Sequence, residues 1–324
     1  MLSKSKGFSP FLLTSLLALA ACENQSTPTQ PPQLPGGAVL AKGNAGGGGE
    51  FPMPTGRLYF ASDIHEPGNL DIYAVNPDGT GLVRLTTAPG DDMLARAAMT
   101  TDRVAFFSDR AGSRQLFMMN TDGTGQVAVY TPSAGTLADL GLSSDGARVA
   151  VIRTIGGQTD IWAVNADGTG LTQLTNDAAV ERTVAWSPNG RELVYSATVG
   201  GQDDVFKLNV GRGTISRLTS GSGANVSPSF SPDGRNIVFA STRDGNYELY
   251  TMRSGGTQQA RLLDKPSWHE VGPVYSPDGV YVAYLSYLAN GTGPVGMRYI
   301  GVGTTGQTGP VSTSSSIMSV SWGR

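Results

Sequence analysis

Residue types that carry chemistry or bind polyanions are scarce in this 324-residue sequence. It contains one cysteine and two histidines, and only 15% of its residues are charged. A single cysteine cannot form an internal disulfide or supply a multi-cysteine metal site. The net charge is −3, and no run of lysine and arginine occurs that could track a phosphate backbone. We therefore expect no nucleic-acid partner and no cofactor.

Glycine, in contrast, is abundant, with 44 residues beside 19 prolines, and hydrophobic residues make up 39% of the chain. This composition favours many short strands joined by tight turns and argues against long helices. Enough apolar residues remain to build a core.

The first 21 residues have the pattern of a bacterial lipoprotein signal peptide. Lys4 and Lys6 precede an apolar run over residues 11–21. As a helix this run is about 16 Å long, too short to cross a bilayer. It ends in Leu-Ala-Ala before Cys22, and this tetrapeptide resembles the lipobox. The alternative is an ordinary secretory signal with a chance cysteine.

The lipobox resemblance implies that residues 1–21 are removed and that Cys22 is acylated, which tethers the chain to a membrane. Glu23 follows the cysteine. By analogy with the Gram-negative sorting rule, in a Gram-negative cell it implies an outer membrane location facing the periplasm. Residues 22–55 are rich in Gln, Thr, Pro and Gly and contain little that could be buried. We interpret them as a flexible tether of about 30 Å typical span.

Residues 56–324 contain a repeat of about 44 residues. The sequence Asn-x-Asp-Gly-Thr-Gly begins at Asn76, Asn120 and Asn165, and degenerate copies begin at Asn209 and Arg253. A second marker, close to Ser-Pro-Asp-Gly, keeps the same spacing; its copies begin at Ser143, Ser187, Ser231 and Ser276. Asp-Gly pairs supply the positive φ angles that hairpin turns need, and β-branched and aromatic residues fill the segments between them.

Four short strands per repeat predict the blades of a β-propeller, although a linear solenoid has similar periods. Five repeats carry an inner strand of their own, beginning near residues 96, 139, 183, 226 and 271, whereas the first begins directly at Gly56. The C-terminal segment Ser319-Val320-Ser321-Trp322 supplies the missing strand. We predict an all-β, six-bladed propeller of four-stranded antiparallel blades, closed when the C-terminal strand joins the first blade.

These residues resemble the TolB-like, WD40-like repeat family of bacterial propellers. Trp186-Ser187-Pro188 and Ser241-Thr242-Arg243-Asp244-Gly245 fit the family pattern closely. The resemblance covers residues 56–324 and implies the fold more strongly than a function. TolB itself carries an additional N-terminal α/β domain that this sequence cannot form. Membership of a Tol–Pal-like envelope integrity system is therefore an alternative and not the first interpretation.

No catalytic constellation is recognisable. Propeller lyases of oligogalacturonides resemble this fold but use several metal-binding histidines, and here only His65 and His269 occur. A polysaccharide lyase or hydrolase remains an alternative. The repeated acids Asp71, Asp160, Asp204 and Glu248 recur at one place in the blade, so we predict structural contacts to the adjacent strand for them. Calcium binding by the Asp-Gly turns is a weaker alternative, because the spacing does not match an EF-hand.

We interpret the chain as a monomeric, non-catalytic scaffold that presents variable loops to an envelope protein or glycan. Residues before the inner strands should border the central channel, and Trp268 is the best anchor candidate, unless it packs between blades. The candidate binding residues are Arg96, Asp139, Arg182, Asn225, Arg243, Trp268, His269 and Glu270.

Overall fold

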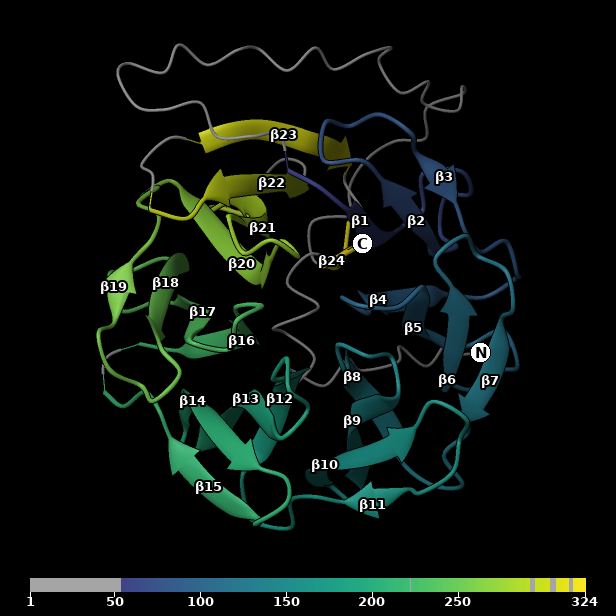
Figure 1. The fold of residues 1–324 in the computed structure, drawn as a ribbon, viewed down its shortest axis with the longest axis horizontal. Helices are drawn as coiled ribbons and strands as arrows, with labels where there is room; N and C mark the ends of the chain where they lie inside the picture. Colours follow the sequence, from purple (N-terminus) through teal and green to yellow (C-terminus); the bar gives the residue numbers. More distant parts are fainter. Residues whose placement is uncertain (1–53, 222, 292–294, 304–306, 315–316) are drawn as a thin grey trace, which may run out of the picture.

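The computed structural model describes residues 54–324, apart from residues 222, 292–294, 304–306 and 315–316, and describes only the backbone of residues 307–314. Within this part of the chain, 24 strands form six four-stranded antiparallel sheets and no helix occurs. Figure 1 shows the sheets arranged as blades around a central axis. The predicted six-bladed propeller is confirmed.

We number the blades along the chain and give their strands from the centre outwards. Blade 1 contains β24 (Val320–Gly323), β1 (Arg57–Ser62), β2 (Asp71–Val75) and β3 (Val83–Arg84); blade 2 contains β4 (Asp92–Ala97), β5 (Arg103–Ser108), β6 (Gln115–Asn120) and β7 (Val127–Tyr130); blade 3 contains β8 (Thr136–Leu142), β9 (Arg148–Ile155), β10 (Gln158–Asn165) and β11 (Thr172–Gln173). Blade 4 contains β12 (Val180–Trp186), β13 (Glu192–Val199), β14 (Gln202–Asn209) and β15 (Thr214–Arg217); blade 5 contains β16 (Asn225–Phe230), β17 (Asn236–Ser241), β18 (Glu248–Arg253) and β19 (Ala260–Arg261); blade 6 contains β20 (Trp268–Tyr275), β21 (Tyr281–Leu288), β22 (Val295–Gly301) and β23 (Gln307–Ser314).

The two ends of the propeller share blade 1, as the sequence predicts. Strand β24 pairs with β1, with Leu58 opposite Trp322. Trp322 is 2% exposed, and its indole nitrogen donates to the carbonyl of Thr55 at 2.9 Å. The Ser321 hydroxyl accepts from the amide of Ala97 in blade 2 at 2.9 Å, so the closing strand also joins the next blade. Closure leaves no unpaired inner strand in the ring.

The repeated Asn-x-Asp-Gly motif forms a self-contained turn between the third and fourth strands of a blade. In the first copy, Asp78 accepts from the amide and the hydroxyl of Thr80 at 2.9 and 2.6 Å. These bonds hold the pKa of Asp78 below its usual value. In the second copy, Gly123 has φ +86°, and a Cβ there would lie 2.7 Å from the carbonyl oxygen of Leu85 in blade 1. The glycine thus permits both the turn and close contact between neighbouring blades.

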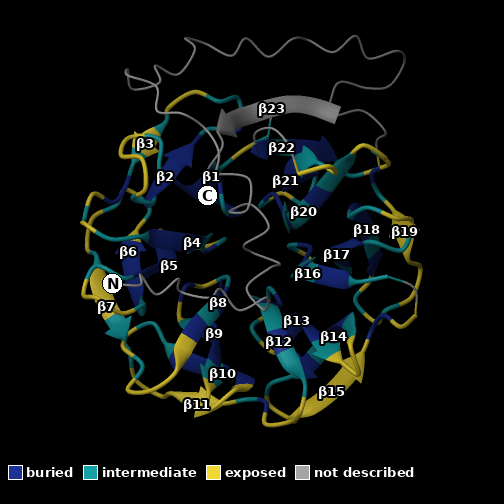
Figure 2. Ribbon diagram, turned by 180° about the vertical axis from the view of Figure 1, so that it is seen from behind, coloured by how far each residue is buried: buried dark blue, intermediate teal, exposed yellow. Residues whose placement is uncertain are grey.

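The core lies between the faces of adjacent blades. Middle strands such as β1, β5 and β17 are almost entirely buried, whereas the outer strands β7, β11, β15 and β19 are largely exposed (Figure 2). Aromatic pairs in ring contact recur there, for example the tilted pair Phe106 and Phe117 in blade 2 and the stacked pair Tyr195 and Phe206 in blade 4. Each pair joins the second and third strands and packs against the neighbouring blade.

The inner strands differ from the prediction in one respect. They begin at residues 92, 136, 180, 225 and 268, earlier than the sequence suggests, and each contains a β-bulge. In β4, β16 and β20 the bulge holds a residue with positive φ, namely Leu94 (56°), Ser227 (53°) and Gly272 (60°). Bulges re-aim the following side chains and recur next to functional sites. For Leu94 and Ser227 this backbone conformation is strained.

Candidate functional site

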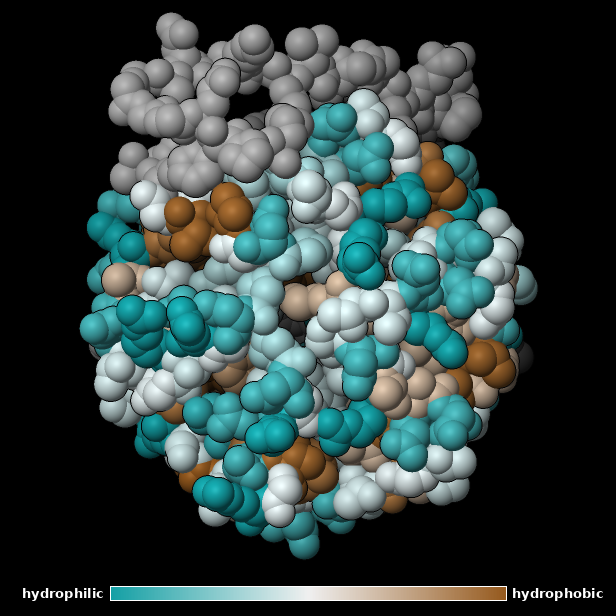
Figure 3. Space-filling model, in the orientation of Figure 1, coloured by the Kyte–Doolittle hydropathy of each residue, from teal (hydrophilic) through white to brown (hydrophobic). Residues whose placement is uncertain are grey.

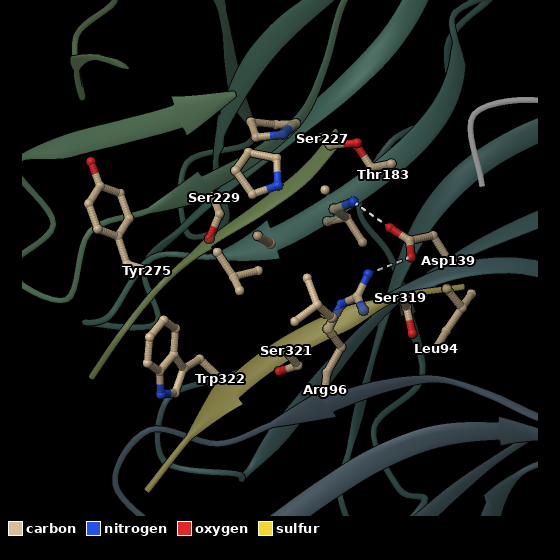
Figure 4. A pocket seen from close by; sticks show the side chains of 18 of the residues that line it. Leu94, Arg96, Asp139, Thr183, Ser227, Ser229, Tyr275, Ser319, Ser321 and Trp322 are labelled. Carbon is tan, nitrogen blue, oxygen red and sulfur yellow. Dashed lines mark hydrogen bonds and ion pairs between the residues drawn. The ribbon is translucent and has the colours of Figure 1, made fainter. Parts of the chain in front are cut away.

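The six inner strands enclose a channel along the axis of the ring. It holds a cavity of about 180 Å³ to which all six inner strands contribute. Figure 3 shows the hollow at the centre of one face. Most of the wall is aromatic, aliphatic or small and polar. Representative side chains are Leu94, Thr183, Ser229, Tyr275, Ser321 and Trp322, which surround the cavity in Figure 4.

Two of the predicted residues, Arg96 and Asp139, meet in this channel. The Arg96 guanidinium lies 3.3 Å from Oδ1 of Asp139, and Oδ2 of Asp139 accepts from the amide of Val184 at 2.9 Å (Figure 4). One carboxylate therefore links blades 2, 3 and 4. Burial raises the pKa of Asp139, and the charge of Arg96 opposes that effect.

Arg182 also borders the channel, as the sequence predicts. Its Nε donates to Asp203 at 3.0 Å and to the Thr198 hydroxyl at 2.8 Å. The two described cations that border the cavity, Arg96 and Arg182, are therefore both paired with carboxylates. The channel wall therefore offers a ligand mainly a concave, apolar surface and no unpaired described cation.

Two further predicted residues do not border the channel, and this part of the prediction is wrong. Asn225 is 1% exposed and donates to Asp204 of blade 4 at 3.0 Å. Glu270 is 0% exposed and lies opposite Ser286 in the sheet. Both residues precede the bulge of their strand, so their side chains point into the gap between two blades. A register change of one residue moves a side chain to the other face of a strand.

Arg243 lies in such a gap as well. Its guanidinium stacks 4.4 Å from the ring centroid of Tyr250 and donates to Asn225 at 2.9 Å. It also bonds the Ser241 hydroxyl at 3.0 Å. These contacts stabilise the contact between blades 4 and 5.

Trp268 and His269 are partly exposed at the start of β20. The guanidinium of Arg298 lies 5.3 Å from the Trp268 ring centroid. His269 packs between Tyr247 and Tyr287, with centroid distances of 5.6 and 5.0 Å, and its Nδ1 accepts from the amide of Tyr247 at 3.0 Å. Tyr287 also borders the channel. These rings form an aromatic cluster beside the channel at blades 5 and 6.

The repeated acids make structural contacts, as predicted. Asp71 is fully buried, accepts from Arg84 at 2.5 Å and binds the Thr86 hydroxyl at 3.2 Å. Asp204 binds Arg217 and Thr219 in the same manner. Asp71 and Asp204 thereby fasten the outer strand of their blades to the third strand.

Two buried glutamates do not have such partners: Glu270, which was a predicted binding residue, and Glu181, which was not predicted. Glu181 is 3% exposed and Glu270 is 0% exposed, and neither has a hydrogen-bond partner for either carboxyl oxygen. Burial raises the pKa of Glu181 to about 7 and that of Glu270 to about 9. A signal existed: blades 2 and 5 carry Ser-x-Arg at the end of the second strand, whereas blade 4 has Ala197 and Val199 there.

Cys22 and the tether lie outside the described residues. Within the described part of the chain, no group of three or more His, Cys, Asp and Glu side chains has the geometry to hold a metal ion. Nδ1 of His65 and the hydroxyl of Tyr73 share a hydrogen bond at 3.0 Å, and the two rings are stacked. No described segment forms a helix long and apolar enough to span a bilayer.

Comparison with known proteins relates the chain to solved structures only, since no family model and no curated protein matches it. It superposes on a putative TolB from Agrobacterium tumefaciens with a TM-score of 0.68 and 22% identity, over 82% of this chain and 91% of that one. For TolB from Acinetobacter baumannii the TM-score is 0.72 with 15% identity, over 84% and 68%. An oligogalacturonate lyase from Vibrio parahaemolyticus gives 0.58 with 13% identity, over 78% and 73%. The fold is that of a TolB-like six-bladed propeller.

Proposed function

We propose that this chain is a lipid-anchored, non-catalytic binding scaffold of the bacterial cell envelope. Its propeller presents the channel and the loops around it to an envelope protein or glycan. The observation that carries this proposal is the state of the charged groups at the channel. Arg96 and Asp139 are 3.3 Å apart, and Arg182 and Asp203 are 3.0 Å apart. Because these charged groups are paired with one another, they are suited to holding the shape of the channel wall for a partner and not to carrying out catalysis.

The wall itself suits recognition. Aromatic side chains come from different blades, including Trp186, Phe230 and Tyr275. Rigid aromatic groups in a concave setting are typical anchors of interfaces. The bulge residues Leu94 and Ser227, which have positive φ angles, border the same wall. A partner would insert a side chain or an extended segment there and contact the Trp268–His269 cluster at the rim.

Site-specific photocrosslinking in living cells tests this function. A photoreactive phenylalanine analogue replaces Tyr287 at the channel, and in a control strain replaces Val127, which is 51% exposed on the outer strand β7. We expect a discrete adduct with an envelope component from position 287 and none from position 127. Equal labelling at both positions, or none at 287, would contradict a channel-centred partner.

The anchor is testable separately. We expect the wild-type chain to incorporate labelled palmitate and to partition into the detergent phase, and Cys22→Ser to do neither. A Cys22→Ser chain that still carries label would contradict lipidation at this residue, whatever the crosslinking experiment gives.

Two alternatives follow from the fold likenesses. A lyase activity would generate unsaturated uronates from oligogalacturonate, and purified protein incubated with divalent metal tests for them by ultraviolet absorbance. A Tol–Pal-like role predicts co-isolation with a peptidoglycan-associated lipoprotein and detergent sensitivity on gene deletion. Neither outcome is expected if the partner is of another kind.

A further inference from the structure

A pocket lies in the gap between blades 3 and 4. Its volume is about 350 Å³. The loop that links the two blades forms one wall, with Asp177 and Ala179, and blade 4 forms the floor, with Tyr195 and Phe206 stacked at 5.6 Å. Val199 and Ile215 border the opening and are each 42% exposed.

The repeat shows what normally fills this space. In blade 2 the guanidinium of Arg110 lies 4.5 Å from the ring centroid of Phe117 and donates to both oxygens of Asp92 at 3.1 and 3.0 Å. Arg243 occupies the same place in blade 5, over Tyr250. Both arginines also donate to a glutamine, Gln126 or Gln259, each at 2.9 Å.

Other gaps are filled by different means. His65 stacks on Tyr73 where blade 1 faces blade 6, and Arg153 lies 5.3 Å from the Trp162 ring in blade 3. In blade 6, Arg298 donates to the Ser286 hydroxyl at 2.7 Å. A cationic or imidazole side chain therefore occupies each of these places.

Strand pairing identifies the corresponding residues of blade 4. Glu181 pairs with Ala197 as Asp92 pairs with Ser108, so Val199 stands where the repeat has Arg110. Ile215 lies opposite Leu208 and takes the place of the glutamine. Blade 4 thus keeps the aromatic floor and the inner-strand acid but has no cation at the position of Arg110 and Arg243. Its nearby cation, Arg217 on β15, lies 5.9 Å from the Phe206 ring centroid and is paired with Asp204.

Glu181 lies opposite Ala197, which lines the pocket, and no described cation forms an ion pair with it. Both carboxyl oxygens of Glu181 are buried without a hydrogen-bond partner. The charged groups that face it are Asp160 on β10 and Asp177 in the linking loop, and both disfavour its ionisation. Burial is the largest cause and raises the pKa of Glu181 to about 7. The pocket is therefore aromatic, is bordered by Asp177, and lies beside an acid, Glu181, that no described cation pairs with; the nearby Arg217 is already paired with Asp204.

We infer that this pocket receives an arginine side chain from a partner protein, which lies over Tyr195 and Phe206 and pairs with Glu181. The partner arginine would take the position that Arg110 and Arg243 hold in their own blades. The aliphatic border of Val199 and Ile215 suits the methylene stem, and Asp177 at the entrance attracts the charge. This site is separate from the channel and goes beyond the proposed function.

A small-molecule assay tests the inference independently of any envelope partner. N-acetyl-arginine methylamide is titrated into the purified propeller and followed by NMR shifts, with the citrulline and leucine analogues as uncharged probes. We expect the arginine probe to bind at least tenfold more tightly than either. Its binding should strengthen between pH 6 and pH 8, as Glu181 ionises. Equal binding of citrulline, tighter binding of leucine or no binding of the arginine probe would each overturn the proposal.

Two variants locate the site. Val199→Arg supplies the cation in cis, and we expect it to abolish binding of the arginine probe and to raise the melting temperature. Glu181→Gln keeps the fold and the shape of the pocket, and we expect it to lower the affinity for the arginine probe at least fivefold. Ile155→Ala, at a residue 38% exposed on β9, serves as the matched surface control. Unchanged probe affinity in both Val199→Arg and Glu181→Gln would place the probe elsewhere and refute the site.

Discussion

The gap between blades 1 and 2 and the gap between blades 5 and 6 treat a buried acid differently. In the first, Asp92 is 0% exposed and accepts two hydrogen bonds from Arg110. In the second, Glu270 takes the equivalent place, opposite a serine of the second strand, but has no hydrogen-bond partner. Burial and the charge of Glu248 raise its pKa to about 9. The acid thus lies at the same place in both blades, but whether a cation pairs with it differs from one gap to the next.

Loss of Arg110 from the gap between blades 1 and 2, where it pairs with Asp92, should have the largest effect on stability. Arg110→Met removes the guanidinium but keeps much of the packing on Phe117. Because Asp92 is then a buried carboxylate without a partner, we expect a loss of about 3–5 kcal/mol in the free energy of unfolding. Urea denaturation at pH 7 measures it.

The exposed Arg103→Met is the matched control for this variant, and its change should stay within about 0.5 kcal/mol. The double variant Asp92→Asn with Arg110→Met should recover part of the loss. A cost for Arg110→Met no larger than that of the control would mean that Asp92 does not depend on this cation.

Removal of the unpaired acid Glu270 should raise the free energy of unfolding, whereas removal of Arg110 should lower it. The folded pKa of Glu270 lies above its unfolded value of about 4.3, so the folded protein holds a proton that the unfolded chain releases. Its contribution to stability is complete below about pH 4 and is lost as the pH rises towards about 9. Glu270→Gln does not titrate, and we expect it to be more stable than wild type by about 2–4 kcal/mol at pH 8 and nearly equal at pH 4.

Thermal and urea unfolding at both pH values test this variant, with Glu192→Gln as control. Glu192 is paired with Lys207 at 3.3 Å on a partly exposed surface, so its substitution should change little at either pH. A Glu270→Gln protein that is less stable at pH 8 would indicate an ionised Glu270 held by a cation, and the contrast with Asp92 would disappear.

Glu181 is expected to behave like Glu270 over a narrower range. Its pKa is raised only to about 7, so the stability that its proton provides is lost between about pH 4 and pH 7. We expect Glu181→Gln to gain about 1–2 kcal/mol at pH 8. The pH dependence of the difference should level off near pH 7, about two units below that for Glu270→Gln. Coinciding profiles would show that the two gaps are not distinct.

The parts of this structure that local chemistry determines were predictable from the sequence. Asp-Gly turns and alternating strands gave the blades, and the Val320–Trp322 segment gave the closure. The bulges were not predictable, because they depend on packing around the channel. They turn Asn225 and Glu270 away from the channel, and their expected position was therefore wrong. Pockets and unpaired acids depend on residues brought together from different blades, although comparison of Val199 with Arg110 and Arg243 along the repeat pointed to one of them.

Breaking the ion pair in the channel should have the smallest effect on the free energy of unfolding. This variant therefore tests whether the contrast between the gaps also applies to the channel. Arg96 and Asp139 have side chains 24% and 7% exposed, and Asp139 keeps the amide of Val184 when Arg96 is removed. Arg96→Gln should therefore cost only about 1 kcal/mol, and less at high salt. Urea unfolding at low and high ionic strength measures both quantities. A loss as large as that of Arg110→Met, unaffected by salt, would mean that Asp139 depends on its cation as strongly as Asp92 does, and the contrast between the channel pair and the pair in the gap would fail.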